Sequence, residues 1–364
     1  MPHPAPPPTP DPGSHDILAT WRDVLLVSCL FIWALFAGAS LLIPLALAML
    51  LFLIIVAVSD WIRWRMRPVT ALPSWVATLF AVVVVMGGFL AVVYVLASQA
   101  NQVLRAIPGY EAELDRAMLR LANLLGSGTA GVIREWITQL DMSRLALSAM
   151  GRAGSILSVL TLILIYVAFM LAERKSFARK IKIAFGSGSY GGDIETMMQA
   201  ISASLRRYIG VKTFTSSLTA LLSYAVFRAV GLEFAETWAV LTFALNFIPT
   251  LGSIVAVGLP VLVSLVQFET LGPILTLLIA CGVIQMAIGY VLDPALTGRS
   301  LNLSALMVIL ALTFWGTLWG LLGAFLSVPL TACAMIVFSH VPVTQPLAVM
   351  MSKDGDILSD RSDG

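Results

Sequence analysis

Long uncharged, apolar runs along the chain are separated by short charged stretches, and this pattern predicts an all-α membrane protein. A helix needs about 20 residues to cross roughly 30 Å of hydrocarbon. The run 24–59 is too long for one span and has Pro44 near its middle, so it predicts two short helices back to back. Further spans are predicted at 74–99, 153–172, 206–228 and 270–292, and two more helices, turning near 315–320, at 300–352.

The uncharged run 237–268 is too long for one ordinary span and too short for two spans with a turn. It is interrupted at Asn246, Pro249 and Gly252, which predicts a re-entrant helix-break-helix hairpin whose two ends face the same side. Because such a hairpin does not cross the membrane, the chain is predicted to have about eight transmembrane helices.

Five regions follow from this pattern. They are a disordered Pro-rich tail (1–16), the first three transmembrane helices (17–98), an extracytoplasmic amphipathic helical insert (99–152), a transmembrane transport core (153–345) and a cytoplasmic tail (346–364). Basic residues follow the second and fourth spans, so these loops and both termini are expected to face the cytoplasm of a bacterial inner membrane. The fifth span is expected to continue a cytoplasmic amphipathic helix that starts near Asp193.

Composition supports the membrane assignment and narrows the function. The chain is 59% hydrophobic and 12% charged, with a mean hydropathy of +0.93, so its partner is the lipid bilayer. A net charge of +2 without a basic face argues against nucleic-acid binding. Three cysteines in apolar runs, with no paired spacing, predict no disulfide, metal site or cofactor. No enzyme motif is present, so an enzyme is not expected, and uphill transport would need an ion gradient.

Polar or broken backbone at membrane depth supplies the candidate site residues, because it costs several kcal/mol unless it is buried in protein or lines a cavity. Asn246, Pro249 and Gly252 form either a substrate or ion pathway or a purely structural turn. Asp293 ends a span; it either caps the following turn or pairs with Arg299, or it has a gating or coupling role. Gln285 is expected to bond between helices or to line the path.

The small residues of the last apolar run and the cations near the span ends are interpreted as structural rather than as part of a site. Gly316, Gly320 and Gly323 have the spacing that lets helices approach closely, so helix packing is the favoured role. Lys212 and Arg228 are expected to lie close enough to helix ends to extend toward the membrane interface.

Four motifs together resemble the autoinducer-2 exporter family of bacterial permeases. They are Tyr208-Ile-Gly210-Val-Lys212-Thr213, then Asn246-Phe-Ile-Pro249-Thr-Leu-Gly252 with Pro260, then Asp293-Pro294-Ala-Leu-Thr-Gly298-Arg299, then Gly316-X3-Gly320-X2-Gly323-X5-Pro329. The resemblance implies about eight spans, cytoplasmic termini, an outer helical insert and a homo-oligomer, with a pentamer as the candidate form. It also implies secondary transport, of autoinducer-2 in some members and of sodium or lithium against protons in others.

The chain departs from the family pattern at two places. Ile288 and Gly289 stand where the family commonly has an acidic residue and an asparagine, and Ser304 stands where it commonly has a histidine. Both departures remove polar or titratable groups, so they weaken the expectation of cation-coupled antiport.

Three hypotheses remain from the sequence. The leading one is a secondary exporter or facilitator of a small polar solute such as autoinducer-2, with its path where the broken hairpin meets the spans around Asp293. The second is a monovalent cation/proton antiporter that uses Asp293. The third is a non-transporting oligomeric scaffold that binds partners through the insert 99–152, for which a path accessible to water at Asn246 would be contrary evidence.

Overall fold

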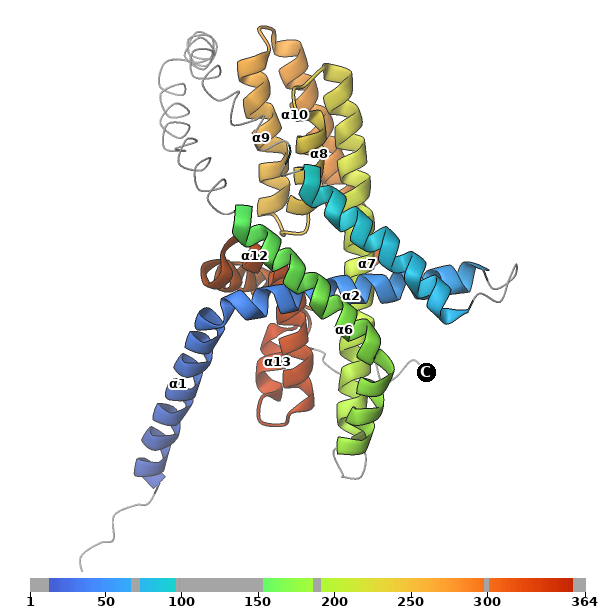
Figure 1. Cartoon of the computed structure of the whole chain (residues 1–364). Coiled ribbons are helices and arrows are strands. Elements are labelled where there is room, and N and C mark those ends of the chain that lie inside the picture. The colour runs from blue at the N-terminus through green and yellow to red at the C-terminus, as the bar shows by residue number, and fades with distance from the viewer. Residues whose placement is uncertain are drawn as a thin grey trace, which may run out of the picture.

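The computed structural model describes residues 13–66, 73–95, 98, 153–185, 191–297 and 301–355. Within these residues the chain is helical throughout, apart from loops and one isolated bridge between Leu303 and Ser352, which confirms the predicted all-α class (Figure 1). The predicted insert 99–152, Arg299 and most of the tail 1–16 lie outside the described residues.

The first apolar run forms two helices, as predicted, but they meet at Gly38 rather than at Pro44. α1 spans Gly13–Ala37 and α2 spans Ala39–Met66, with Pro44 buried inside α2. A Cβ atom at Gly38 would lie 2.9 Å from the Ala34 carbonyl oxygen, so the chain bends where the side chain is missing. Pro44 lies beyond the first turn of α2, so its missing N–H removes the helical hydrogen bond to the Ser40 carbonyl oxygen, but the helix continues through this position.

Two further helices pack against α2. The helix Ser74–Val95 and α6 (Ala153–Phe185) share one apolar core with α2, formed by Ala48, Leu51, Ile55, Ala81, Met86, Ile163 and Val167. Where α2 leaves this core, Asp60 lies 3.9 Å from Arg174 of α6 and 3.5 Å from Arg206 of α7. These two contacts join α2, α6 and α7 at the basic end of the molecule.

α7 (Gly191–Val230) is one continuous helix of 40 residues, about 60 Å long, so the predicted continuity of the helix from near Asp193 to Arg228 is confirmed. Its first half packs on α2 and α12 through Leu50, Leu53, Ile201, Leu205, Ile209 and Leu326. Its second half enters a bundle with α8, α9 and α10 (Figure 1).

That bundle contains the predicted broken hairpin. α8 (Ala235–Leu245) and α9 (Leu251–Gln267) are separated by a turn at 246–250, so the helix-break-helix pattern is confirmed. α10 (Leu271–Met286) continues through a π-helical turn, η1 (Ala287–Leu292), into α11 (Asp293–Thr297). Around the bundle, each helix packs on the next, in the order α7, α8, α9, α10 and back to α7.

The C-terminal apolar run turns back on itself where predicted. α12 (Ala305–His340) is kinked at Gly320, which has φ 64° and ψ −144°. α13 (Gln345–Met351) begins the segment predicted as a cytoplasmic tail and packs on α12 through Met335, Ala348 and Met351.

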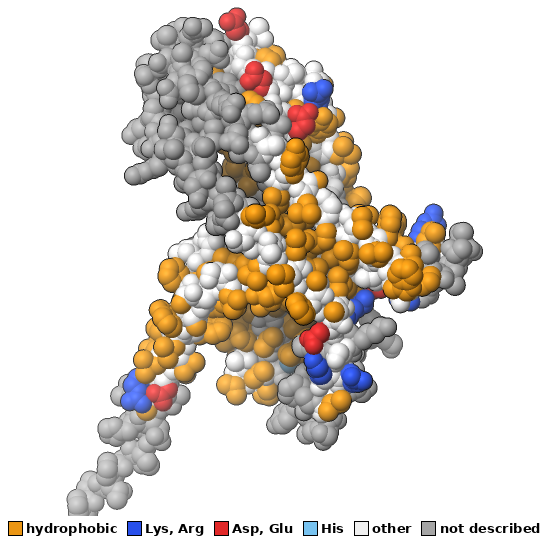
Figure 2. All heavy atoms as spheres, viewed as in Figure 1, with side chains coloured by type: hydrophobic (Ala, Val, Ile, Leu, Met, Phe, Trp, Pro, Cys, Tyr) orange, Lys and Arg blue, Asp and Glu red, His pale blue; other side chains and the backbone are white. Residues whose placement is uncertain are grey.

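The helices expose apolar side chains to the surroundings, as lipid-facing helices do. Among the described residues, five helices have the length and apolarity to cross a membrane: Ala39–Met66, Ser74–Val95, Leu157–Arg174, Leu271–Leu296 and Ala305–His340. Hydrophobic side chains are spread over much of the visible described surface, and acidic side chains lie at the top end and at places lower down (Figure 2). The protein is therefore a multi-pass helical membrane protein.

Candidate functional site

Each of the four bundle helices turns one stripe of buried residues toward the others. The stripes lie three or four residues apart, as expected for one helix face. They are Ser216, Thr219, Ser223 and Phe227 on α7; Ala235, Ala239, Thr242 and Asn246 on α8; Gly252, Ala256, Pro260 and Ser264 on α9; and Ile274, Leu277, Cys281 and Gln285 on α10. Small and polar side chains predominate, so the bundle interior is more polar than its lipid-facing surface.

The polar members gather at the end of the bundle where α8 and α9 break. Because neighbouring helices run in opposite directions, Ser216, Asn246, Gly252 and Gln285 lie at this end, while Phe227 and Ile274 lie at the other. Asn246 is 6% exposed, and its Nδ2 donates to Ser216 Oγ at 3.1 Å. The predicted asparagine at the break therefore bonds to the neighbouring helix rather than to the freed backbone.

Gly252 allows the break to be this tight. A Cβ atom there would lie 1.8 Å from the Leu245 carbonyl oxygen, so α9 starts directly against the last turn of α8. Between them, Pro249 is partly buried and Thr250 has φ 59°, a left-handed conformation that costs a β-branched residue energy. Asn246 and Pro249 thus lie in the turn, and Gly252 lies in the first turn of α9.

Asp293 pairs with a residue that we expected elsewhere. Lys212 lies in the middle of α7, and its Nζ donates to Asp293 Oδ2 at 2.7 Å. The sequence analysis did not anticipate this contact, in which a carboxylate of the protein stabilises the ammonium. Arg299, the partner considered from the sequence, is outside the described residues.

α7 brings the break and the ion pair together. Lys212, which binds Asp293, and Ser216, which binds Asn246, are one helical turn apart, or about 6 Å along the axis. The rise between Arg206 and Arg228 is about 33 Å, close to the hydrocarbon thickness. Measured from Arg206, Ser216 lies roughly 15 Å along the helix. The break is thus near the middle depth of α7's apolar stretch.

Two buried polar side chains at this site have no hydrogen-bond partner among the described residues. Gln285 is only 8% exposed, and neither its amide oxygen nor its amide nitrogen has a partner there. The hydroxyl of Thr242, a residue that is 1% exposed, also has none. Leaving a buried donor or acceptor unpaired costs about 1–3 kcal/mol. No described residue completes the predicted interhelical bond of Gln285, so its amide can bind another group.

A second hairpin of the same design meets the first. A Cβ atom at Gly323 would lie 1.9 Å from the Trp315 carbonyl oxygen, which matches the contact of Gly252 with Leu245. Phe247 of the first break stacks on Phe325 with ring centroids 4.9 Å apart. The residues Gly316, Gly320 and Gly323, predicted to pack separate helices, therefore lie at and beside a turn within α12, where Gly323 permits the two arms to touch.

An internal repeat in the sequence indicates this second hairpin, and the sequence analysis did not identify it. Leu241-Thr242-Phe243 precedes Leu251-Gly252 by the same spacing at which Leu312-Thr313-Phe314 precedes Leu322-Gly323. A search for self-similarity would have found it. Ser216 belongs to a hydroxyl-rich stretch of the fifth predicted span that could line a polar path, whereas the sequence analysis missed Thr242, because a hydroxyl on a helix more often bonds to its own backbone.

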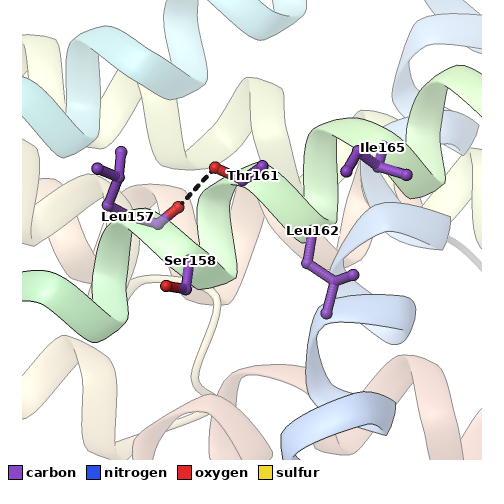
Figure 3. A pocket seen from close by; sticks show the side chains of 5 residues that line it. All are labelled: Leu157, Ser158, Thr161, Leu162 and Ile165. Atoms are coloured by element: carbon purple, nitrogen blue, oxygen red, sulfur yellow. Dashed lines mark hydrogen bonds between the residues drawn. The ribbon is translucent and has the colours of Figure 1, made fainter.

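A surface groove on α6 lies apart from this site. Its volume is about 470 Å³, and it is lined by Leu157, Ser158, Thr161, Leu162 and Ile165, all from one helix (Figure 3). The Thr161 hydroxyl already donates to the Leu157 carbonyl oxygen at 2.9 Å. No charged side chain lines this groove, so it offers little to a polar ligand.

The fold and site define a polytopic membrane protein with discontinuous helices around a buried polar centre. The family model described as AI-2E family transporter matches residues 24–342, and the chain belongs to this family. It is 30% identical to AI-2 transport protein TqsA of Escherichia coli over 320 residues, 86% of this chain and 90% of TqsA. Two more relatives are named as transport proteins. The one from Haemophilus influenzae is 29% identical over 329 residues, which cover 88% of this chain and 93% of the relative. YhhT of E. coli is 27% identical over 353 residues, which cover 94% of this chain and 96% of YhhT.

Proposed function

We propose that the protein is a secondary transporter that exports or facilitates a small polar solute such as autoinducer-2. The observation that carries the proposal is the group of unpaired, buried polar atoms of Gln285 and Thr242 in the bundle that holds the broken hairpin. A solute with hydroxyl groups would supply the missing hydrogen bonds. The family membership and the name of the E. coli relative support transport and this class of solute.

The chemistry of the site favours an uncharged solute. The buried stripes contain amide, hydroxyl and thiol groups but no charged side chain, and the two nearby charges, Lys212 and Asp293, neutralise each other. A bound anion or cation would lose its hydration without a fixed opposite charge to replace it. A neutral polyol loses less and regains its hydrogen bonds from the side chains.

For the topology, we propose about eight crossings, with 237–268 re-entrant and both termini in the cytoplasm of a bacterial inner membrane. The clustering of Asp60, Arg174 and Arg206 at one end supports a cytoplasmic basic side, and Glu233, Glu236 and Glu269 lie at the opposite end of the bundle. We also propose a homo-oligomer, with five subunits as the number to test.

A monovalent cation/proton antiporter is the second candidate. Asp293 favours it, because a carboxylate that is 19% exposed at the end of a span is the kind of group that exchanges a cation for a proton. The bond from Lys212 weighs against it.

Gln285→Leu separates a transport role from a structural role. Leucine has a similar volume and needs no partner, so the variant is expected to raise the melting temperature by about 2–4 °C. Because the solute would lose its amide partner, we expect autoinducer-2 flux in proteoliposomes to fall at least about tenfold. Wild-type flux must exceed that of protein-free liposomes, and a variant with lowered stability and unchanged flux would contradict the assignment.

A further inference from the structure

We propose that Lys212 is a built-in cation that occupies Asp293 and thereby makes transport independent of Na⁺ and Li⁺. This inference rests on the proposed transport function but concerns its energy coupling. It names Lys212 as the residue that decides between the facilitator or exporter and the cation antiporter.

The ion pair between Lys212 and Asp293 is less exposed than the five other ion pairs found among the described residues. Its side chains are 12% and 19% exposed, whereas each partner in the other pairs is at least 37% exposed. Exposed pairs exchange freely with dissolved ions, but a half-buried ammonium 2.7 Å from its carboxylate is harder for water or salt to displace.

The position of Asp293 makes it the natural place for a cation in this bundle. It directly follows the π-helical turn η1, and its N–H donates to the Ile288 carbonyl oxygen. Such turns are frequent at functional sites. Asp293 is also held one helical turn along α7 from the Ser216–Asn246 contact, close to the proposed solute path. A carboxylate left without its ammonium here would attract a proton or a small cation.

In the described part of the chain, the two ion-paired arginines of α7 have carboxylate partners of their own. Arg206, also on α7, pairs with Asp60, and Arg228, Glu236 and Glu269 lie toward the other end of the bundle. Tyr208 lies one turn before Lys212 and is buried. A Na⁺ ion approaching Asp293 would therefore meet the positive charge of Lys212, which repels it and already occupies the carboxylate oxygen.

The test is cation binding by the purified, full-length protein, measured without transport. Melting temperatures are compared in NaCl, LiCl and choline chloride at equal ionic strength for wild type, Lys212→Met, Lys212→Arg and Lys212→Met with Asp293→Asn. We expect wild type and Lys212→Arg to show no difference among the salts. Lys212→Met should gain about 2–4 °C in Na⁺ or Li⁺, and the double variant should lose that gain.

Two results would overturn the proposal: a salt response of wild type that Asp293→Asn removes, or no response in Lys212→Met. If Lys212→Met does not fold in choline chloride, its recovery by Na⁺ or Li⁺ counts as support, and Lys212→Gln provides a second neutral variant with the same expected gain. Failure of autoinducer-2 transport by the wild type would contradict the proposed function but would leave these melting temperatures interpretable.

Discussion

Gly252→Ala is expected to abolish transport and to destabilise the protein by about 1–3 kcal/mol or more. The added methyl group would lie 1.8 Å from the Leu245 carbonyl oxygen, and backbone on both sides of the break prevents a small local adjustment. α9 would have to move away from α8, which would also pull Asn246 from Ser216. Autoinducer-2 flux and the melting temperature in detergent measure the two effects.

Gly258→Ala is the matched control for this change. Gly258 is on the same helix, and no atom lies within 4 Å of its added Cβ outside its own backbone. Alanine also favours the helix by roughly 0.8–1 kcal/mol relative to glycine, so this variant should be at least as stable as wild type. Equal behaviour of the two variants would contradict the tight turn at 246–252.

Removing one partner of the Lys212–Asp293 ion pair is expected to have the second large effect. In choline chloride, Lys212→Met or Asp293→Asn is each expected to cost about 1–3 kcal/mol, because each leaves a half-buried charge without this partner. The double variant leaves no buried charge, so its loss should be much smaller than the sum of the two single losses. Unfolding free energies of the four proteins give the coupling between the residues.

The control pair for this cycle is Arg228 and Glu236, which lie 3.8 Å apart but are 65% and 48% exposed. The same cycle there should give a coupling of only about 0.2–1 kcal/mol. Additive losses at Lys212 and Asp293, with no more coupling than at this exposed pair, would show that the contact is not a buried ion pair.

Much of the fold could be predicted because lipid imposes a simple rule on sequence. Uncharged runs of sufficient length had to become helices, and the break at 246–252 followed from Pro249 and Gly252 in a run too long for one span. The turn within α12 followed in the same way from a run that no single span can fill. Local composition was enough for these elements.

The site was harder to predict because it depends on contacts between distant segments. Asn246, Gln285 and Asp293 were found from their polarity in apolar runs, but their partners were not. Lys212 is 81 residues from Asp293 in sequence, and only the long α7 brings the two together. The boundary at Gly38 was missed because proline signals a break more strongly in sequence than glycine does, whereas its position within a helix decides its cost.

Autoinducer-2 flux in proteoliposomes of Asn246→Leu tests most directly whether the broken hairpin forms the solute path. Thr276→Leu is the control, because Thr276 is an exposed polar residue of α10 whose hydroxyl bonds only to its own helix in the described contacts. We predict that Thr276→Leu transports like wild type, while Asn246→Leu loses at least about tenfold, since the amide no longer serves the path. Wild-type flux in Asn246→Leu, and equally in Pro249→Leu, would contradict a solute path through this hairpin.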